Sequence, residues 1–413
     1  MTKYNSLRGM PDIIQDDARI FEEVETLARS LFRLFEFREI RTPVVESTEV
    51  FTRSIGEGTD IVEKEMYTFL DRGGKNISLR PEGTASVMRA YIEHGWANTG
   101  DITKLFYIGS MFRGERPQKG RLREFHQIGA EIIGGKGPYL DAEIISVFEA
   151  LLKKFGVTDY KILINSLGCA ADRDNYKNIL KEFLLKNKLE LCEDCARRVD
   201  TNVLRVLDCK RETCRDIVKN APSILASLCE ICLKDFNTLK TLLSRAGSPF
   251  KEEPRIVRGL DYYTGVIFEV IHPGLGSQDA LGAGGRYDNL SEQMSGPKTG
   301  ATGFALGIER LLLILNRDNM PKNNQGVLVA GLDESSVEEA FILTQKLRGM
   351  GITADMEYSS RSLKGALRKA NREGRNSVVL IGENELKAGK FLLKNMKTST
   401  QELVTFEELA GKL

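Results

Sequence analysis

The stretch from Leu105 to Gly134 constrains the fold most, because apolar and aromatic residues flank a segment of Gly, Pro, Lys and Arg that is too polar to be buried. This pattern predicts a strand, a charged loop and a returning strand. Successive side chains of a strand point to opposite faces. One face therefore carries Arg123, Phe125, Gln127, Gly129 and Glu131 of the second strand and Tyr107, Arg113 and Glu115 of the first. The opposite face of the second strand is apolar and is predicted to be core.

The polar face of this hairpin has two interpretations. Antiparallel sheets often leave one face in water, so the face could simply be solvated. The residue types favour a binding site instead. The planar fork of arginine donates two parallel hydrogen bonds to a phosphate or carboxylate, and Phe125 offers a flat surface on which a base could stack. We therefore interpret this face as the lining of a site.

The hairpin resembles a known family. The sequences FRGE at 112–115 and REFHQ at 123–127 are similar to motif 2 of the class II aminoacyl-tRNA synthetases, and in detail to that of the histidyl-tRNA synthetases. The extended segment IRTPVVE at 40–46 resembles motif 1, which builds the dimer interface in class II enzymes. Its proline suits a sheet edge or an interface. The small residues of 300–310, which lead into a predicted helix, resemble motif 3.

A second informative stretch, RIVRGLDYYTG at 255–265, narrows the resemblance to histidine. The part RGLDYYTG resembles a signature peptide peculiar to histidyl-tRNA synthetases. It precedes a predicted strand at 266–270, and sites are often built at strand ends. The run GAGGRYD at 282–288 also matches the family, although a glycine-rich run by itself is commonly a turn.

Length and pattern predict a multidomain chain of α+β and α/β parts. A chain of 413 residues is too long for one compact core. The resemblance implies a class II catalytic domain with an antiparallel sheet at 1–324, interrupted by an inserted, cysteine-containing helical subdomain at 169–253. Strands and helices alternate at 325–413, which resembles the α/β anticodon-binding domain of this group. A basic stripe of Arg361, Lys364, Arg368 and Arg372 in that domain fits RNA contact and a solvated helix face equally well.

The inserted subdomain holds the seven cysteines of the chain. Cys192-x2-Cys195 and Cys229-x2-Cys232 have the spacing of paired thiolates that share one tetrahedral zinc ion. The alternative is that these cysteines are reduced thiols of a small core. A zinc ion bound there would be structural and remote from the chemistry.

The resemblance implies a two-step reaction. L-Histidine attacks the α-phosphorus of ATP, which arrives with Mg²⁺, and the histidyl group then passes to the 3′ end of tRNA(His). The implied nucleotide contacts are Arg113 to the α-phosphate, Glu115 and Arg121 to the nucleotide, and Phe125 and Arg310 around adenine. Arg258, which would bridge the histidine carboxylate and the α-phosphate, joins Arg113 as the implied catalytic pair.

The histidine contacts are also implied by the resemblance. They are Glu82, Thr84 and Gln127 for the α-amino group, Glu131 with Tyr263 for the imidazole, and Gly83 and Tyr262 as further lining residues. Glu82 and Thr84 begin a predicted helix at 85–94, so both have an alternative interpretation as helix caps. An acid and a phenol beside imidazole would discriminate against apolar amino acids, which would leave those polar groups unpaired.

The remaining expectations concern partners and location. Arg116 and Gln118 in the hairpin loop are predicted to contact the tRNA acceptor end. A homodimer through motif 1 and a cytoplasmic location without membrane contact are expected. The formal net charge of +1 supplies no general attraction to RNA. Two rivals are a synthetase-like regulatory subunit of ATP phosphoribosyltransferase and a tRNA-sensing module without catalysis.

Overall fold

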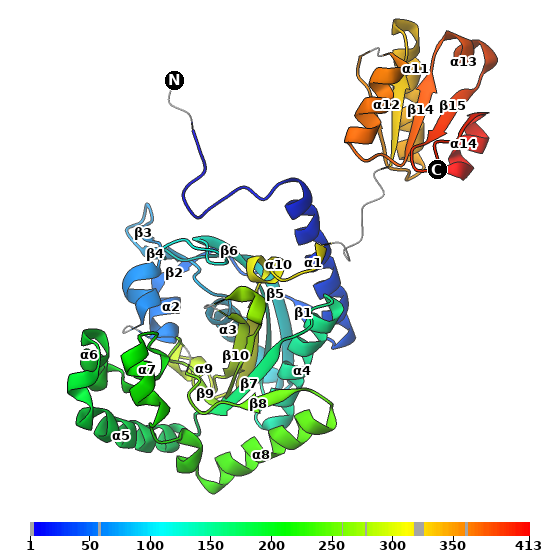
Figure 1. The fold of residues 1–413 in the computed structure, drawn as a ribbon. Helices are drawn as coiled ribbons and strands as arrows, with labels where there is room; N and C mark the ends of the chain where they lie inside the picture. The colour runs from blue at the N-terminus through cyan, green and yellow to red at the C-terminus, as the bar shows by residue number, and fades with distance from the viewer. Residues whose placement is uncertain (1–3, 57–58, 258, 277–278, 318–325, 360–361) are drawn as a thin grey trace. The chain divides into compact units, whose positions relative to one another are not determined.

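The computed structural model describes residues 4–56, 59–257, 259–276, 279–317, 326–359 and 362–413. The chain divides into two compact units, Met1–Met320 and Pro321–Leu413. We describe each unit by itself (Figure 1).

An extended antiparallel sheet organises the first unit. Among the described residues eight strands form it, in the order β1-β5-β6-β11-β10-β9-β7-β8. The strands are β1 (Arg38–Glu39), β5 (Thr103–Phe112), β6 (Glu124–Ile133), β7 (Lys161–Ser166), β8 (Phe250–Glu252), β9 (Thr264–Ile271), β10 (Ala280–Arg286) and β11 (Ala301–Gly307). The pairs at its two edges, β1 with β5 and β7 with β8, are parallel, and the inner pairs are antiparallel. The predicted hairpin is confirmed as the β5–β6 pair.

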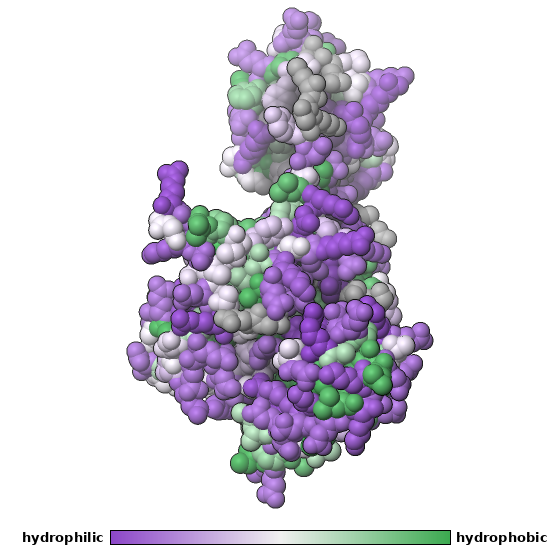
Figure 2. Space-filling model, turned by 90° about the vertical axis from the view of Figure 1, so that its left-hand side faces the viewer, coloured by the Kyte–Doolittle hydropathy of each residue, from purple (hydrophilic) through white to green (hydrophobic). Residues whose placement is uncertain are grey.

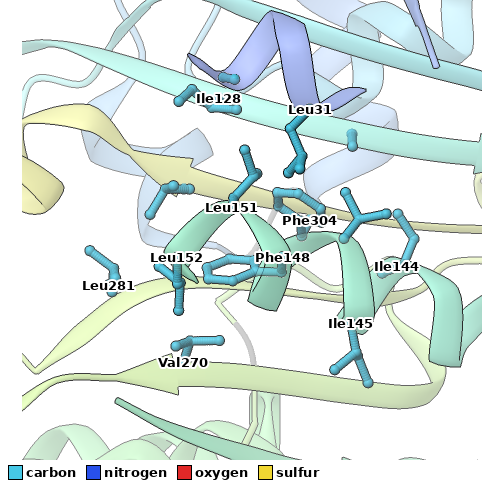
Figure 3. Close-up of a cluster of buried hydrophobic side chains, with 14 of the residues drawn as sticks. Leu31, Ile128, Ile144, Ile145, Phe148, Leu151, Leu152, Val270, Leu281 and Phe304 are labelled. Carbon is cyan, nitrogen blue, oxygen red and sulfur yellow. The ribbon is translucent and has the colours of Figure 1, made fainter. Parts of the chain in front are cut away.

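Three helices cover one face of this sheet. They are α1 (Gln15–Leu34), α4 (Pro138–Lys154) and α8 (Glu230–Arg245). Leu31 of α1, Phe148 of α4 and Ile128 of β6 belong to one buried apolar cluster, which Figure 3 shows between helix and sheet. The even-numbered residues of β6 thus face the core, as the alternation predicts. The odd-numbered side chains of β6 point to the other face of the sheet, which carries the candidate site.

The glycine-rich segments are strands at the centre of the sheet, not turns. β10 and β11 pair with each other and place glycines opposite large side chains. A Cβ on Gly282 would stand 2.8 Å from the ring of Phe148, and one on Gly284 would stand 2.7 Å from Cβ of Phe304. Real Cβ atoms do not approach so closely, so glycine is required here for packing. Motif 3 is therefore a strand followed by a short helix, α10 (Ile308–Leu312).

A small second sheet and short helical segments follow β1 in the chain. The sheet has the order β2-β4-β3 among the described residues, with β2 (Val45–Ser47), β3 (Thr68–Leu70) and β4 (Asn76–Leu79). The helices are α2 (Thr48–Ile55) and the π-helical turn η1 (Ile61–Glu65). The segment with Pro43 leads into β2 at the sheet edge, as the proline predicts. Helix α3 (Thr84–Glu93) follows β4, and α9 (Leu290–Gln293) follows β10.

The insertion is helical, as expected. It contains α5 (Ala170–Lys186), α6 (Glu193–Thr201), the 3₁₀ segment η4 (Val203–Asp208) and α7 (Glu212–Lys219), which Figure 1 shows grouped at one side of the sheet. Its last part belongs to the main body instead. Phe236 and Leu239 of α8 lie in the same core cluster as α4, and β8 extends the main sheet.

The second unit is a mixed α/β sheet with the order β13-β12-β14-β15-β16 in its described residues. The elements are β12 (Val327–Gly331), α11 (Glu334–Gly349), β13 (Ala354–Met356), α12 (Leu363–Arg372), β14 (Ser377–Ile381), α13 (Glu383–Ala388), β15 (Phe391–Asn395), β16 (Gln401–Val404) and α14 (Phe406–Lys412). The predicted alternation through β14 is confirmed. Arg361 of the basic stripe lies outside the described residues, and its other three members are exposed.

The surface is mostly hydrophilic on the face that Figure 2 presents, with small separate hydrophobic patches. None of the described helices combines the length and apolar character that crossing a bilayer requires.

Candidate active site

The β5–β6 register builds the floor of the site. Tyr107 pairs with Gly129, and Leu105 pairs with Glu131. Directly paired residues share a face, so the odd-numbered side chains of both strands point away from the helices α1 and α4. Gly83 and Gly129 leave room for the ring of Tyr107, because a Cβ at either position would stand 2.3 Å or 2.1 Å from its Cζ. The glycines next to the site are therefore required by a tyrosine within it.

Glu131 is the most completely buried acid of this face, with none of its surface exposed. Its carboxylate accepts a hydrogen bond from Thr84 Oγ1 at 2.7 Å and another from the hydroxyl of Tyr287. Burial raises the pKa of Glu131 to about 8, although those two hydrogen bonds lower it. The side chain fits because residue 303 on the neighbouring strand is glycine, whose added Cβ would stand 1.7 Å from Oε2 of Glu131.

Glu82 lies at the start of helix α3 and is also buried. Its carboxylate accepts hydrogen bonds from the backbone N–H groups of Thr84, at 2.7 Å, and Ala85, at 2.9 Å. Glu82 therefore caps the start of α3, which was one of the two interpretations of this residue. Burial raises the pKa of Glu82, with those N–H groups acting against it.

A group of tyrosines lies beside the acids of the site. The rings of Tyr262 and Tyr263 have centroids 4.8 Å apart, and those of Tyr262 and Tyr287 are 5.6 Å apart. Burial raises the pKa of Tyr262 and Tyr287 well above the usual tyrosine value. Their hydroxyls therefore stay protonated and act as neutral hydrogen-bond donors.

Two buried polar atoms in this region have no hydrogen-bond partner among the described residues. They are the hydroxyl of Tyr107 and Oε1 of Gln127. Leaving such a group unpaired costs about 1–3 kcal/mol, and native proteins rarely retain that cost without a reason.

A second cluster lies toward the turn that joins β5 to β6. Arg113 donates from Nε to the carbonyl of Pro81 at 2.9 Å, and its guanidinium lies 5.2 Å from the ring centre of Phe125. Arg121 pairs with Glu115 at 3.2 Å. These side chains present a fixed cation beside a flat ring, an arrangement that suits a phosphate attached to a base.

Arg310 of α10 joins the same region from the third motif. Its Nε donates to the carbonyl of Gly120 at 3.2 Å, so α10 is tied to the hairpin turn. Burial lowers the pKa of Arg310, with the nearby Arg121 acting in the same direction. Two guanidinium groups brought together in this way favour an anion between them.

The two motifs are also held together by a histidine. The N–H and Nδ1 of His126 lie 2.9 Å and 2.8 Å from the carboxylate of Glu309, and its Nε2 lies 3.0 Å from Ser110 Oγ. Burial lowers the pKa of His126, but the hydrogen bond to Glu309 and the charges of Glu309, Glu124 and Glu25 together outweigh burial, so the pKa is raised. This contact is structural, because it orients α10 on β6.

The predicted residues fall into three groups. Glu82, Gly83, Thr84, Gln127, Glu131, Tyr262 and Tyr263 come together at one end of the hairpin, and Arg113, Glu115, Arg121, Phe125 and Arg310 at the other. Arg116 and Gln118 are exposed in the turn. Arg258 lies outside the described residues. The sequence did not predict Tyr287 as a site residue, although its segment matched the family. Its hydrogen bond to Glu131 is the observation that places it in the site.

Comparison with known proteins identifies the family of the chain. The family model described as histidyl-tRNA synthetase matches residues 9–311, and the model described as anticodon binding domain matches residues 322–413. The chain belongs to the histidyl-tRNA synthetase family. It is thus a class II aminoacyl-tRNA synthetase, with the catalytic and anticodon-binding parts of that class.

Relatives named histidine–tRNA ligase match this family member over nearly its whole length. The one from Thermosipho melanesiensis is 45% identical over 412 residues, covering 99% of this chain and 98% of the relative. The one from Halothermothrix orenii is 46% identical over 409 residues, covering 98% of each. The structure of apo histidyl-tRNA synthetase from S. aureus matches with a TM-score of 0.83 and 34% identity, over 99% of both chains.

The cysteines of this family member group differently from expectation. Cys192, Cys195, Cys209 and Cys214 form one cluster, and Cys169, Asp172, Cys229 and Cys232 form another. The two Cys-x2-Cys pairs thus belong to separate clusters, so the prediction that they share one ion is wrong. Spacing along the chain cannot show which pairs meet, because the helices between them decide it.

The buried acid leads to a prediction about stability and pH. The folded pKa of Glu131, about 8, lies above its ordinary value of 4.5. The native protein therefore keeps a proton that the unfolded chain loses. The resulting contribution to stability is present below the unfolded pKa and is lost as pH rises through the folded pKa, by at most about 1.4 kcal/mol per pH unit.

We expect wild type to lose stability relative to Glu131→Gln as pH rises from about 5 to about 8. Urea unfolding at a series of pH values measures this difference. Glu292→Gln on the exposed surface of α9 is the control, because it removes a carboxylate without altering a buried one. Parallel pH profiles for wild type and Glu131→Gln would show that Glu131 is ionised in the native protein and would refute the prediction.

Proposed function

We propose that this histidine–tRNA ligase works in two steps at the two clusters of its site. Histidine first attacks the α-phosphorus of ATP, forming histidyl-adenylate and releasing pyrophosphate. The 3′-terminal hydroxyl of tRNA(His) then displaces AMP and takes the histidyl group. The observation that carries this proposal is the joining of an acid-and-tyrosine pocket to an arginine-and-aromatic cluster on one hairpin face.

The pocket around Glu131 suits imidazole. Imidazole has two nitrogens that can each donate or accept, so a protonated carboxyl and a phenol on opposite sides can satisfy both. Tyr263 is the proposed second partner, with Tyr262 as a neighbouring wall. The buried hydroxyl of Tyr107 supplies a further donor that lacks a partner in the free protein. An apolar amino acid would leave these groups unpaired, which disfavours its binding strongly.

The start of α3 suits the α-amino group of histidine. Glu82 carries negative charge there when ionised, and Thr84 adds a hydroxyl on the adjacent turn. The unpartnered Oε1 of Gln127 is an acceptor for the same ammonium. Gly83 lets the chain pass close to Tyr107.

The arginine cluster suits ATP. Arg113 is proposed to hold the α-phosphate, with Glu115 and Arg121 fixing the nucleotide. Phe125 and Arg310 would enclose the adenine ring. Mg²⁺ enters with the triphosphate as part of the substrate. Positioning and charge stabilisation carry such a phosphoryl reaction, since the protein forms no covalent bond to the reacting groups.

Exchange of labelled pyrophosphate into ATP, dependent on added histidine, tests the function. We expect exchange with histidine and none with leucine or glutamine. A structure titled ATP phosphoribosyltransferase regulatory subunit/histidyl-tRNA synthetase from Bacillus halodurans shares this fold at 21% identity, with a TM-score of 0.66. No exchange with any amino acid would favour a regulatory or tRNA-sensing role over the enzyme proposed here.

The proposal also includes the domain boundaries, the cellular location and the binding of tRNA. The catalytic domain is assigned to 1–324 with its insertion at 169–253, and the anticodon-binding domain to 325–413. The cytoplasmic location rests on the seven cysteines, none of which is in a disulfide, because that compartment disfavours disulfides. Binding of tRNA(His) rests on the match to the anticodon binding domain.

The hairpin turn gives a prediction for the transfer step. Gln118 and Arg121 exchange backbone hydrogen bonds of 3.0 Å and 2.9 Å, which fixes the turn while the side chain of Gln118 stays exposed. Together with Arg116 it is placed to meet an unstacked RNA end. Gln118→Ala should slow transfer to tRNA and leave adenylate formation intact, measured as two separate rates in single-turnover assays. Gln293→Ala, at an exposed glutamine of α9, is the control; equal losses in both steps would reject the role.

The small sheet gives a prediction about assembly. Val44 and Val45 beside Pro43 are 41% and 39% exposed, and Leu70 on β3 is 65% exposed. Exposed apolar side chains at the two edges of the small sheet favour contact with a second copy of the chain, and twofold dimers are the commonest assembly. Light scattering should give twice the chain mass of 46.2 kDa. Val44→Asp should weaken the dimer. Leu189→Asp, which changes a fully exposed leucine, is the control and should not weaken it. An active wild-type monomer would refute the prediction of a dimer.

Arg258 gives the prediction for the chemical step. The resemblance puts its guanidinium between the histidine carboxylate and the α-phosphate as these two anions approach. A fixed cation there stabilises the transition state more than either separate ground state. Arg258→Ala should lower the adenylation rate constant about 10²- to 10³-fold, and Arg258→Lys should recover little, because a point charge cannot bridge two partners.

Rapid-quench measurement of adenylate formation at saturating substrates tests this role. The control is Arg255→Ala, which removes an exposed guanidinium that donates to the carbonyl of Lys219 at 2.7 Å. Transfer from preformed histidyl-adenylate should suffer less than activation in Arg258→Ala. An unchanged activation rate with only a raised Michaelis constant for histidine would make Arg258 a binding residue.

A further inference from the structure

Four cysteine sulfurs of the insertion converge on one point. The Sγ atoms of Cys192, Cys195, Cys209 and Cys214 all lie within 4.8 Å of one another, and those of Cys192 and Cys209 are 4.0 Å apart. A Zn–S bond is about 2.3 Å, so the sulfurs of a tetrahedral site stand roughly 3.8 Å apart. The cluster therefore needs only a small contraction to take an ion.

The local structure around these cysteines resembles a ligand set more than a core. Cys192 immediately precedes α6 and Cys195 lies in its first turn, while Cys209 ends η4 and Cys214 lies in the first turn of α7. Helix starts carry partial positive charge, which stabilises thiolates. The backbone N–H of Cys192 also donates to Sγ of Cys214 at 3.2 Å. The spacings Cys-x2-Cys and Cys-x4-Cys both fall within those of closed zinc sites.

Plain thiol packing explains this arrangement poorly. Cys195 and Cys214 are fully buried, but Cys192 and Cys209 are only partly so. Half-exposed thiols add little apolar burial, yet the four sulfurs converge from three elements, α6, η4 and α7. The cysteines are also not joined as disulfides, which leaves every sulfur available as a ligand.

We propose that Cys192, Cys195, Cys209 and Cys214 bind one zinc ion as a closed tetrathiolate site. The thiols release their protons when the ion binds. With four protein ligands the ion has no open position for substrate, so it is structural. It joins the start of α6, the end of η4 and the start of α7, elements that otherwise share a small core.

The ion also supports a segment that contacts the signature peptide. Arg205 of η4 donates to the carbonyl of Gly259 at 2.7 Å and lies 3.7 Å from Asp60. Cys209 ends the same 3₁₀ segment. Zinc bound at Cys209 therefore fixes the element from which Arg205 reaches the peptide, without itself meeting any reacting group.

The second cluster of the insertion provides the internal control. There Asp172 accepts hydrogen bonds from the backbone N–H groups of Cys169, at 3.2 Å, and Cys229, at 3.1 Å. One carboxylate thus caps the starts of both α5 and α8. This role accounts for the position of Asp172 beside Cys169 and Cys229 without an ion.

Elemental analysis of the full-length chain, purified with a thiol reductant and no chelator, tests the proposal. We expect about one zinc per chain in wild type. This zinc should be lost in Cys209→Ser and in Cys214→Ser, and it should be retained in Cys232→Ser. Because Cys214→Ser removes a buried side chain, the wild-type chain supplies a second measurement. Titration with a mercurial reagent should release that zinc as the thiolates react. Amide hydrogen exchange should then become faster across residues 192–218, and the exchange rate of α4 should stay unchanged.

Cobalt substitution reports the ligand set directly. Co²⁺ bound in place of zinc should show the intense visible bands of a tetrahedral tetrathiolate, and these bands should be missing in Cys209→Ser. Absence of metal from the wild-type chain, even after incubation with Zn²⁺ under reducing conditions, would overturn the proposal. So would an equivalent of zinc that survives Cys209→Ser but is lost in Cys232→Ser.

Discussion

The carboxyl group of Glu131 is the constraint on which the site depends. A fully buried acid is costly unless it is neutral or fully hydrogen-bonded. Here the group is held between Thr84 and Tyr287, and its raised pKa keeps a proton near neutral pH. The proton has a chemical use, because a neutral acid can donate to one imidazole nitrogen without repelling the nearby Glu82. The selectivity we propose for histidine follows from that protonation.

The rest of the catalytic sheet makes room for this group. Gly303 on β11 gives space to the carboxyl, and Gly83 and Gly129 give space to the ring of Tyr107. On the opposite face, apolar side chains from α1, α4 and α8 pack against the same strands and keep them rigid. Rigid strands hold polar groups in position for a transition state at no cost during the reaction. The packed face and the polar face of the sheet thus serve one purpose.

The sequence predicted those parts of the structure that depend on local chemistry. Alternation along β6 correctly assigned Glu131 to the site face and Ile128 to the core. It could not identify β10 and β11 as central strands, because glycine lacks the side chain that strand patterns rely on, and the need for glycine arises from neighbours such as Phe148. Tyr287 and the true partners of Cys192 were missed for a related reason: both depend on contacts between distant segments, which spacing does not encode.

The protonation state of Glu131 is the most direct test of this account. Infrared difference spectra of wild type minus Glu131→Gln isolate the carbonyl stretch of its protonated carboxyl. We expect this band to be present at neutral pH in the free protein and to disappear with a midpoint near 8. A band that is already absent at pH values near the ordinary glutamate pKa of 4.5 would mean a buried anion, and the proposed basis for histidine recognition would be contradicted.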